Sequence, residues 1–312
     1  MTKLWKIAGL LMGVVVIGLA GLYAYLSPDR LKAIVVPELA SALNRTVFLD
    51  RVSLRLWGGI GASIAGLRVD ARAGFGPEPF IRAESGEITI SLMSLIFGQA
   101  DIGELRIRKP VIRITIDEEG TANYSDLVDE IGQSSSGGRL PVLPITRLSI
   151  LDGLLVQEDR QTGSTVLLEG IDYEVDLRPV VNGLGLDGRL TIATIRVLEA
   201  TAIGPSMNNV SIDHRVTLSS ESDELRIDRI ALSVGPVGIT ISGSIVSLSE
   251  DAPRLDLTIK ETTAELTYSE SGTEVSGNVD IDVSVTGPYD PASKPPRLPS
   301  LKGRILAEEF RI

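Results

Sequence analysis

The sequence predicts a mainly β protein, in which an N-terminal transmembrane helix precedes a long, curled, mostly antiparallel β-sheet that forms an open groove. Hydrophobic residues make up 43% of the chain and aromatic residues only 4%, so the apolar side chains are mostly Ile, Leu and Val, which favour strands. Short runs that alternate apolar and polar residues recur from residue 46 to the end, as roughly 15 short strands at hairpin spacing. A sheet of that size must curl, close or split, and no helix-rich segment follows Leu43 to cover its apolar face.

Residues 7–26 form the predicted membrane segment, because they contain no charged residue and are long enough for one spanning helix. Lys3 and Lys6 precede this segment and favour a cytoplasmic N-terminus. A cleaved signal peptide is the alternative, since small residues such as Ala20 and Ala24 permit cleavage, but its apolar region is usually only about 7–15 residues long. We therefore expect residues 1–27 to be an uncleaved anchor.

Residues 28–45 predict a short amphipathic helical segment, with Pro28 at its start and Asp29 in its first turn. This segment lies on the membrane or closes one end of the sheet. Residues 46–312 then predict one elongated β-groove domain. Within that domain, the Ser-, Gly- and Pro-rich residues 130–144 predict a flexible loop.

The stretch from Ile102 to Leu127, IGELRIRKPVIRITIDEEGTANYSDL, shows the strand pattern most clearly. Its apolar positions alternate with charged ones, and the alternation shifts by one residue after Pro110. Proline cannot donate a ladder hydrogen bond, so it indicates a bulge or an edge, and a bulge changes which residues face inward. The predicted inward positions are Leu105, Ile107, Ile112, Ile114 and Ile116.

Two further local features carry specific predictions. Asp152-Gly153 lies between two apolar alternations and predicts a hairpin turn. His214 lies in the polar-looking run SIDHRV and predicts an exposed strand residue.

The apolar face of the predicted strands is the candidate binding site, since it suits an apolar ligand. Candidate lining residues are Val52, Leu54, Leu56, Leu67, Val69, Ile88, Ile90, Leu92, Leu105, Ile107, Ile112, Ile114, Ile116, Ile171, Val175, Leu177, Ile239, Ile241, Val279, Ile281 and Val283. A sandwich in which the sheet packs on itself is the alternative, and periodicity alone does not separate it from a groove. A membrane barrel is disfavoured, because 5 Phe, 6 Tyr and 2 Trp are few for its aromatic girdles.

Several classes of chemistry find no support in the sequence. The chain has no Cys and one His, so a Cys-ligated or His-ligated metal site and a Ser-His-Asp triad are hard to build. No phosphate-binding or hydrolase motif occurs, and residues 117–119 form an acidic run typical of a turn. A net charge of −11 disfavours nucleic acid as a partner. We expect no catalytic residue, metal or cofactor, and a protein that is not an enzyme.

The stretch around Pro110 resembles the signature of the AsmA family. In that pattern a strand, a Pro and an Ile/Leu-rich strand precede a polar turn with Gly, followed by Asn; here these are Pro110, Gly120 and Asn123, with Leu127 after them. A Ser/Gly-rich loop and the run PITRLSILDGLLVQEDRQTG then resemble a second family motif. The resemblance extends from Met1 to about Leu177, and only the strand rhythm continues beyond it.

This resemblance implies a single-pass inner-membrane protein of a Gram-negative bacterium, with a cytoplasmic N-terminus and its bulk in the periplasm. It implies a β-groove that binds phospholipid acyl chains and supports lipid transport and outer-membrane biogenesis. The implied partners are membrane phospholipids and the inner membrane. About 15 strands at ~4.8 Å span on the order of 70 Å, so an envelope protein or an oligomer would have to complete a path between two membranes. The alternative is an envelope scaffold or regulator whose β-domain binds outer-membrane assembly partners.

Overall fold

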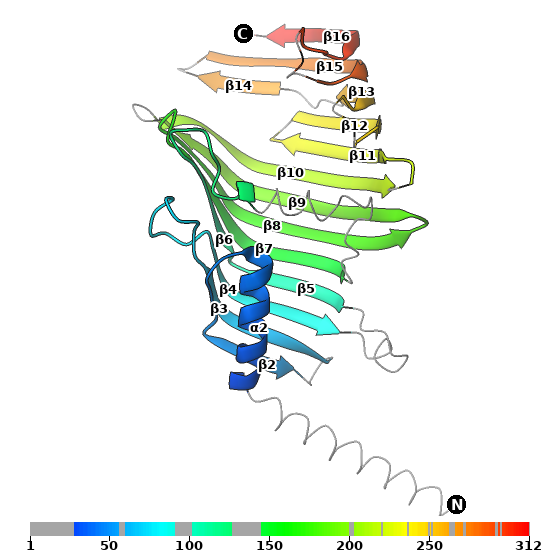
Figure 1. Ribbon diagram of the computed structural model, residues 1–312. Helices are drawn as coiled ribbons and strands as arrows, with labels where there is room; N and C mark the ends of the chain where they lie inside the picture. Colours follow the sequence, from blue (N-terminus) through cyan, green and yellow to red (C-terminus); the bar gives the residue numbers. More distant parts are fainter. Residues whose placement is uncertain are drawn as a thin grey trace, which may run out of the picture.

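The computed structural model describes residues 28–55, 60–90, 102–126, 145–199, 203–219, 221–235, 237–248, 250, 252–261, 266–270, 273–290, 293 and 295–311. One helix and one sheet of sixteen strands make up this part of the chain (Figure 1). The elements are α2 (Pro28–Leu43), β1 (Val47–Phe48), β2 (Arg51–Arg55), β3 (Ile60–Val69), β4 (Ile81–Ile90), β5 (Ile102–Arg108), β6 (Val111–Ile116), β7 (Ile145–Asp159), β8 (Ser164–Val180), β9 (Gly183–Leu198), β10 (Ile203–Ser219), β11 (Glu224–Val234), β12 (Val237–Val246), β13 (Arg254–Glu261), β14 (Leu266–Glu270), β15 (Thr273–Pro288) and β16 (Ser300–Arg311).

The predicted anchor (residues 1–27) and the predicted flexible loop (130–144) lie outside the described residues. In the part of the chain that the structure describes, no helix is both long and apolar enough to cross a membrane. The prediction of a mainly β, mostly antiparallel sheet is confirmed.

The strands follow one another across the sheet in the order β1-β3-β4-β5-β7-β8-β9-β10-β11-β12-β13-β15-β14. Most neighbours are antiparallel hairpin partners, as the spacing predicts. The exception is β7, which runs parallel to both β5 and β6. Strand β2 pairs with β3, and β16 pairs with β15 at the far end of the sheet.

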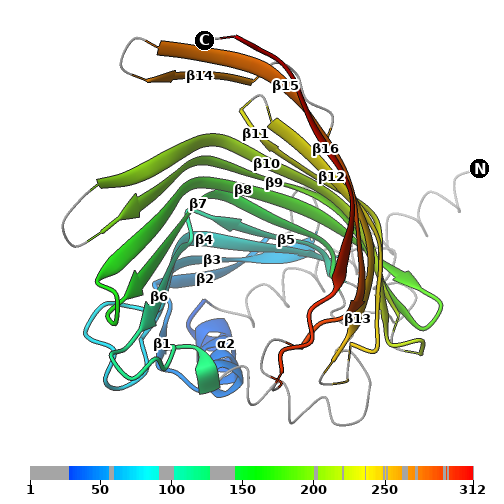
Figure 2. The ribbon, with the colours of Figure 1, turned by 90° about the horizontal axis from the view of Figure 1, so that it is seen from above.

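A line of left-handed backbone positions crosses the sheet from β3 to β10, and Figure 2 shows that the strands turn sharply. These positions fall in gaps between the ladder pairs of neighbouring strands: Gly66, Lys109, Asp152, Gly170 and Asn209, with φ of 63°, 46°, 53°, 62° and 55°. The ladder pairs resume on both sides of the line, so the strands continue through it. The line therefore bends one sheet into two walls.

The alternation changes phase at Pro110 as predicted, because Lys109 has a positive φ and Pro110 separates β5 from β6. The bulge offered as one explanation is not seen, since the register with β4 and with β7 continues across Pro110 without an extra residue. The hairpin predicted at Asp152-Gly153 is wrong. Strand β7 runs unbroken from Ile145 to Asp159, and Asp152 is the bulge that carries it through the bend. Strands that cross the bend are correspondingly long, up to 17 residues in β8 and β10, and not short as predicted.

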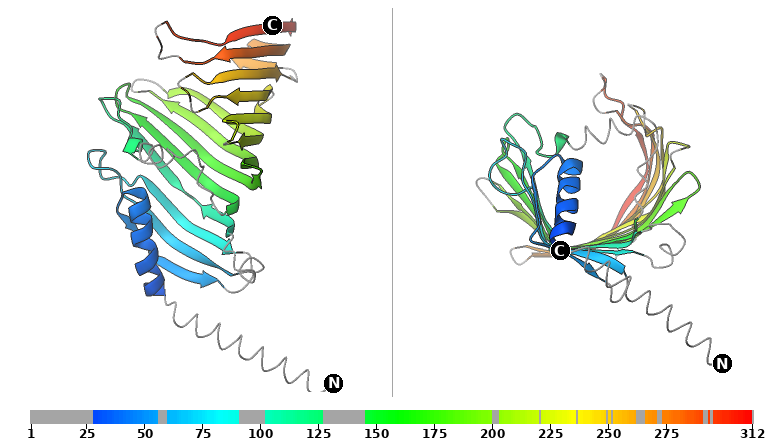
Figure 3. Two further views of the ribbon diagram at one scale, coloured as in Figure 1. Left: turned by 45° about the vertical axis from the view of Figure 1, so that its right-hand side comes forward. Right: turned by 60° about the horizontal axis from the view of Figure 1, so that its bottom comes forward.

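Helix α2 lies on the concave side of the sheet, at the β1–β3 end (Figures 2 and 3). It continues through Pro37 as one helix. The buried cluster beneath it consists of Val47, Val69 and Phe80, with Leu39 and Leu43 of the helix packed against it. Of the two positions predicted for residues 28–45, the helix therefore takes the one that covers an end of the sheet.

The turn after β6 holds the end of α2 in place. Asn123 is 2% exposed, and its Nδ2 donates to the carbonyl oxygen of Arg113 at 2.8 Å. The guanidinium of Arg45 donates to the carbonyl oxygen of Asn123 and pairs with the carboxylate of Asp126 at 2.5 Å. The side chain of Arg45 is 5% exposed. The Asn of the family-like motif thus has a structural role.

Candidate functional site

Ladder partners share a face of a sheet, so the register identifies the residues on each face. One row of partners runs across the sheet from β2 to β12 without a charged side chain. Its members are Val52, Ile64, Gly86, Ile107, Ile150, Tyr173, Leu190, Ile212, Leu232 and Ile239. A neighbouring row runs from β8 to β16, through Leu177, Leu186, Val216, Ile227, Gly243, Leu257, Val285 and Leu301.

These rows lie on the concave side. Helix α2 is on that side and contacts β2, and Val52 is 1% exposed while its neighbour Arg51 is exposed. The helix therefore covers the face of β2 that carries Val52. Beyond the bend, the face of β3 that carries Val69 packs against the same helix.

Most predicted site residues lie on this face. They are Val52, Leu54, Leu67, Val69, Ile88, Leu105, Ile107, Ile112, Ile114, Ile116, Ile171, Val175, Leu177, Ile239, Ile241, Ile281 and Val283. The ladder pairs Ile90 with Ile60 and Val279 with Ala307, in phase with the other residues of this face. Leu56 and Leu92 lie outside the described residues. The second wall is less apolar, because Ile114 and Ile116 pair with Gln157 and Asp159.

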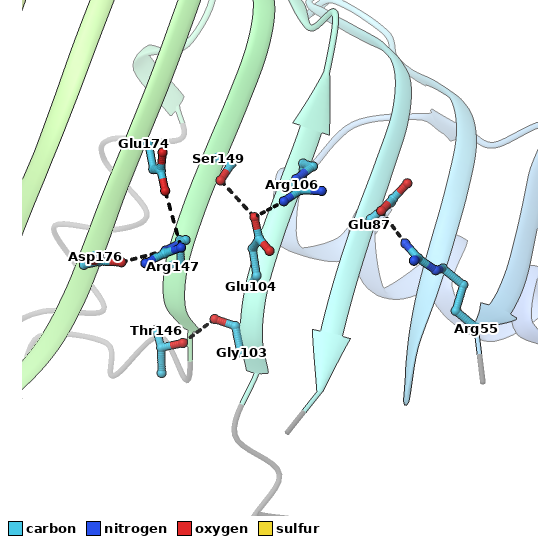
Figure 4. A network of polar contacts seen from close by, with 10 residues as sticks. All are labelled: Arg55, Glu87, Gly103, Glu104, Arg106, Thr146, Arg147, Ser149, Glu174 and Asp176. Atoms are coloured by element: carbon cyan, nitrogen blue, oxygen red, sulfur yellow. Dashed lines mark hydrogen bonds and ion pairs between the residues drawn. The ribbon is translucent and has the colours of Figure 1, made fainter. Parts of the chain in front are cut away.

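The convex face carries a network of polar contacts (Figure 4). Arg55 pairs with Glu87, and Glu104 accepts hydrogen bonds from Arg106 and from Ser149 at 2.8 and 3.0 Å. Further along the sheet, Arg147 pairs with Asp176 and with Glu174 at 2.7 and 3.4 Å. Hydrogen bonding from Arg147 holds the pKa of the Asp176 carboxyl below its ordinary value. This face is solvated and its charges largely compensate one another.

The apolar face is only partly buried. In the described part of the chain the one cluster of buried apolar residues is that beneath α2, and all sixteen strands belong to one sheet, so no second sheet packs on the rows. Ile107, Ile150, Leu190 and Ile212 are all partly exposed. The self-packed sandwich finds no support among the described strands.

His214 contradicts its prediction as an exposed strand residue. It is half-buried on the concave face, in ladder with Gly188 and Ile230. Its Nε2 lies 3.1 Å from the hydroxyl of Tyr173, and the two ring centroids are 5.8 Å apart. The sequence contained the signal, because His214 falls in phase with the apolar alternation of β10.

The arrangement offers contacts for an apolar chain over most of its width. No group of acidic or His side chains suited to a metal is found among the described residues. Charged side chains on the concave face include Asp159, opposite Ile116, and Glu261, which pairs with Ile239 and is 8% exposed.

Comparison with known proteins identifies no relative. No family model matches the chain, and no curated protein matches its sequence. The resemblance of residues 1–177 to the AsmA family therefore stays a prediction made from their motifs.

Proposed function

We propose that this protein is an AsmA-like lipid-binding protein, whose concave apolar face forms an open groove for phospholipid acyl chains. In this proposal residues 1–27 anchor the chain in the inner membrane, the β-sheet stands in the periplasm, and the groove supports lipid transport for outer-membrane biogenesis. The chain then acts by binding and guiding its ligand, without a chemical step.

One observation carries the proposal: continuous rows of apolar side chains on the concave side of a bent sheet, of which Ile107, Ile150, Leu190 and Ile212 are partly exposed while Leu177, Ile227 and Val285 are buried. Such a surface is unfavourable in water unless something covers it. In the part of the chain that the structure describes, the one helix is α2, and it covers the β1–β3 end. The convex side, in contrast, carries compensated charges and is suited to water.

The energies are of the right size for lipid binding. Exposing an acyl chain to water costs about 0.8 kcal/mol per methylene, so a typical chain costs on the order of 10 kcal/mol. A continuous row of Ile, Leu and Val side chains offsets that cost without a reactive group. Several rows side by side allow the ligand to move along the sheet and keep similar contacts.

The proposal is tested by placing one charge on either face of the same strand. Val283 lies on the apolar face between Ile259 and Gly303, and its neighbour Ser284 lies on the polar face between Thr258 and Lys302. We expect Val283→Asp to keep the fold, since the side chain is partly exposed, and to lower severalfold the phospholipid that co-purifies with the protein. Ser284→Asp is the matched control and should leave both fold and lipid content unchanged.

Mass spectrometry of lipids extracted from the full chain in mild detergent measures the result, with circular dichroism as the check on folding. Wild-type protein that carries no phospholipid would contradict the proposal. So would equal lipid content in Val283→Asp and Ser284→Asp.

A second candidate function is the envelope scaffold, and the free edge of the sheet favours it. Among the described strands, β16 pairs with β15 alone, and its side chains Leu301 and Ile305 are 69% and 66% exposed. An apolar edge strand is a template for pairing with another chain. A scaffold of this kind requires the edge strand β16, where the rows end, and not the rows further inside the sheet. Val283→Asp would then leave partner binding intact while Ile305→Lys would abolish it.

A further inference from the structure

We propose that Tyr173 and His214 form a polar recognition site within the apolar face, which hydrogen-bonds an acceptor oxygen in the glycerol-phosphate region of a bound phospholipid. This inference rests on the proposed lipid-binding function and adds to it the part of the ligand that is recognised. The two side chains come from strands two apart, β8 and β10.

The contact between the two side chains depends on a glycine. Gly188 on β9 lies between Val175 and His214 in the ladder. A Cβ at this position would come within 3.0 Å of His214 Nε2 and 2.5 Å of the carbonyl oxygen of Glu174. Because glycine has no side chain, the imidazole can reach across β9 to the Tyr173 hydroxyl.

The pair keeps one hydrogen-bond donor for a ligand, whichever of the two residues donates in the hydrogen bond between them. If the Tyr173 hydroxyl donates to Nε2, the neutral imidazole carries its proton on Nδ1; if Nε2 donates instead, the hydroxyl proton is free. No described residue bonds Nδ1. Burial raises the pKa of Tyr173, which keeps the phenol a donor at neutral pH.

The surroundings point to an apolar ligand with a polar part. The ladder neighbours of the two residues on this face are Ile150, Leu190 and Ile230, besides Gly188. A polar pair there weakens the apolar surface and contributes little to a fold that Phe and Leu would serve better. Binding sites for amphipathic molecules have this composition: mostly apolar, with a few polar groups that fix the orientation.

The acceptor oxygens of a phospholipid fit this pair best. Phosphate oxygens accept hydrogen bonds and lie close to two acyl chains, so the chains can follow the apolar rows on either side. A hydrogen bond to an ionised phosphate is stronger than one to a neutral group, and its loss lowers affinity by about tenfold or more.

Binding of two labelled lipids to the immobilised full chain in detergent tests this inference. The probes are dioleoylphosphatidic acid and dioleoylglycerol, which share their acyl chains and glycerol and differ in the phosphate. We expect wild type to prefer the phospholipid by about tenfold or more, and Tyr173→Phe and His214→Leu each to remove most of that preference without weakening dioleoylglycerol binding. Tyr289→Phe, at a 46% exposed tyrosine, is the control and should behave as wild type.

Each outcome has one meaning. If wild type binds neither lipid, the proposed function itself fails. If wild type binds both lipids equally, or the two variants keep the preference, the Tyr173–His214 site is wrong while the groove stands. Free glycerol 3-phosphate distinguishes a lipid site from a site for a soluble phosphate. We expect it not to compete with the labelled phospholipid, and effective competition would overturn the lipid assignment.

Discussion

Truncating Asn123 to alanine should loosen the turn that holds α2 against the sheet. Asn123 is 2% exposed, and its Nδ2 bonds the carbonyl oxygen of Arg113 at 2.8 Å. Leaving that carbonyl buried without a partner costs about 1–3 kcal/mol, and the void left by the amide adds about 1 kcal/mol. The Oδ1 atom of Asn123 is buried without a partner, so its removal recovers part of the loss. We expect a net local destabilisation of about 2 kcal/mol.

Hydrogen exchange measures this local free energy directly. The amide of residue 123 bonds the carbonyl oxygen of Thr115 at 2.9 Å in wild type, and alanine keeps that N–H. A loss of about 2 kcal/mol should speed its exchange about 30-fold. Thr121→Ala, at an exposed position two residues away, is the control and should change the local free energy by less than about 0.5 kcal/mol. Equal exchange in the two variants would refute a structural role for Asn123.

Three further changes test other parts of the fold. Gly188→Ala should lower the free energy of unfolding in urea by about 1–3 kcal/mol, because the added Cβ would lie 2.5 Å from a carbonyl oxygen. Gly185→Ala on the same strand is the control and should lower it less, because its Cβ meets nothing closer than 3.5 Å. Asp126→Ala should cost about 1–3 kcal/mol, below the value for a fully buried pair because the Asp126 side chain is 22% exposed. Hydrogen bonding from Arg45 lowers the pKa of Asp126 below 3.8. The stabilisation by the Arg45–Asp126 pair is therefore fully present above that pH and is lost as pH falls through the lower pKa of the folded state. The difference in unfolding free energy between wild type and Asp126→Ala should vanish in acid and not in base. Ile305→Lys should lower the concentration-dependent self-association of the chain in sedimentation, since Ile305 is 66% exposed on a free edge strand, and unchanged sedimentation would show that this edge does not pair.

Strand periodicity predicted the class of fold and the composition of its apolar face. The alternation in β6 and its shift after Pro110 follow from steric and hydrogen-bonding rules, and the structure has a left-handed residue, Lys109, at that point. Asp152-Gly153 shows the limit of such rules. The same two residues suit a two-residue hairpin and a left-handed bulge inside a continuous strand, and only the neighbouring strands decide between them.

Other features depend on contacts that one strand does not contain. The parallel pairing of β7 with β5 depends on where the chain returns after a long connection, and no local pattern encodes it. The polar residues beside His214 indicate an exposed side chain, whereas its phase in β10 indicates the apolar face. Its partner Tyr173 is 41 residues away, so the pair becomes visible only when the sheet is assembled.

The bend decides what the apolar face is able to do. In a regular strand, residues five apart face opposite sides of the sheet. Ile107 and Ile112 are five apart on either side of the bend, and both face the concave side. A flat sheet with the same pattern would turn its apolar residues to opposite faces on the two sides of the line. The left-handed residues Lys109 and Asp152 therefore do two things at once, since they fold the sheet into two walls and keep the apolar side chains on the inside of both. Because the side-chain period of a strand is two, deleting one of these residues would turn the side chains beyond it, on that strand, to the opposite face.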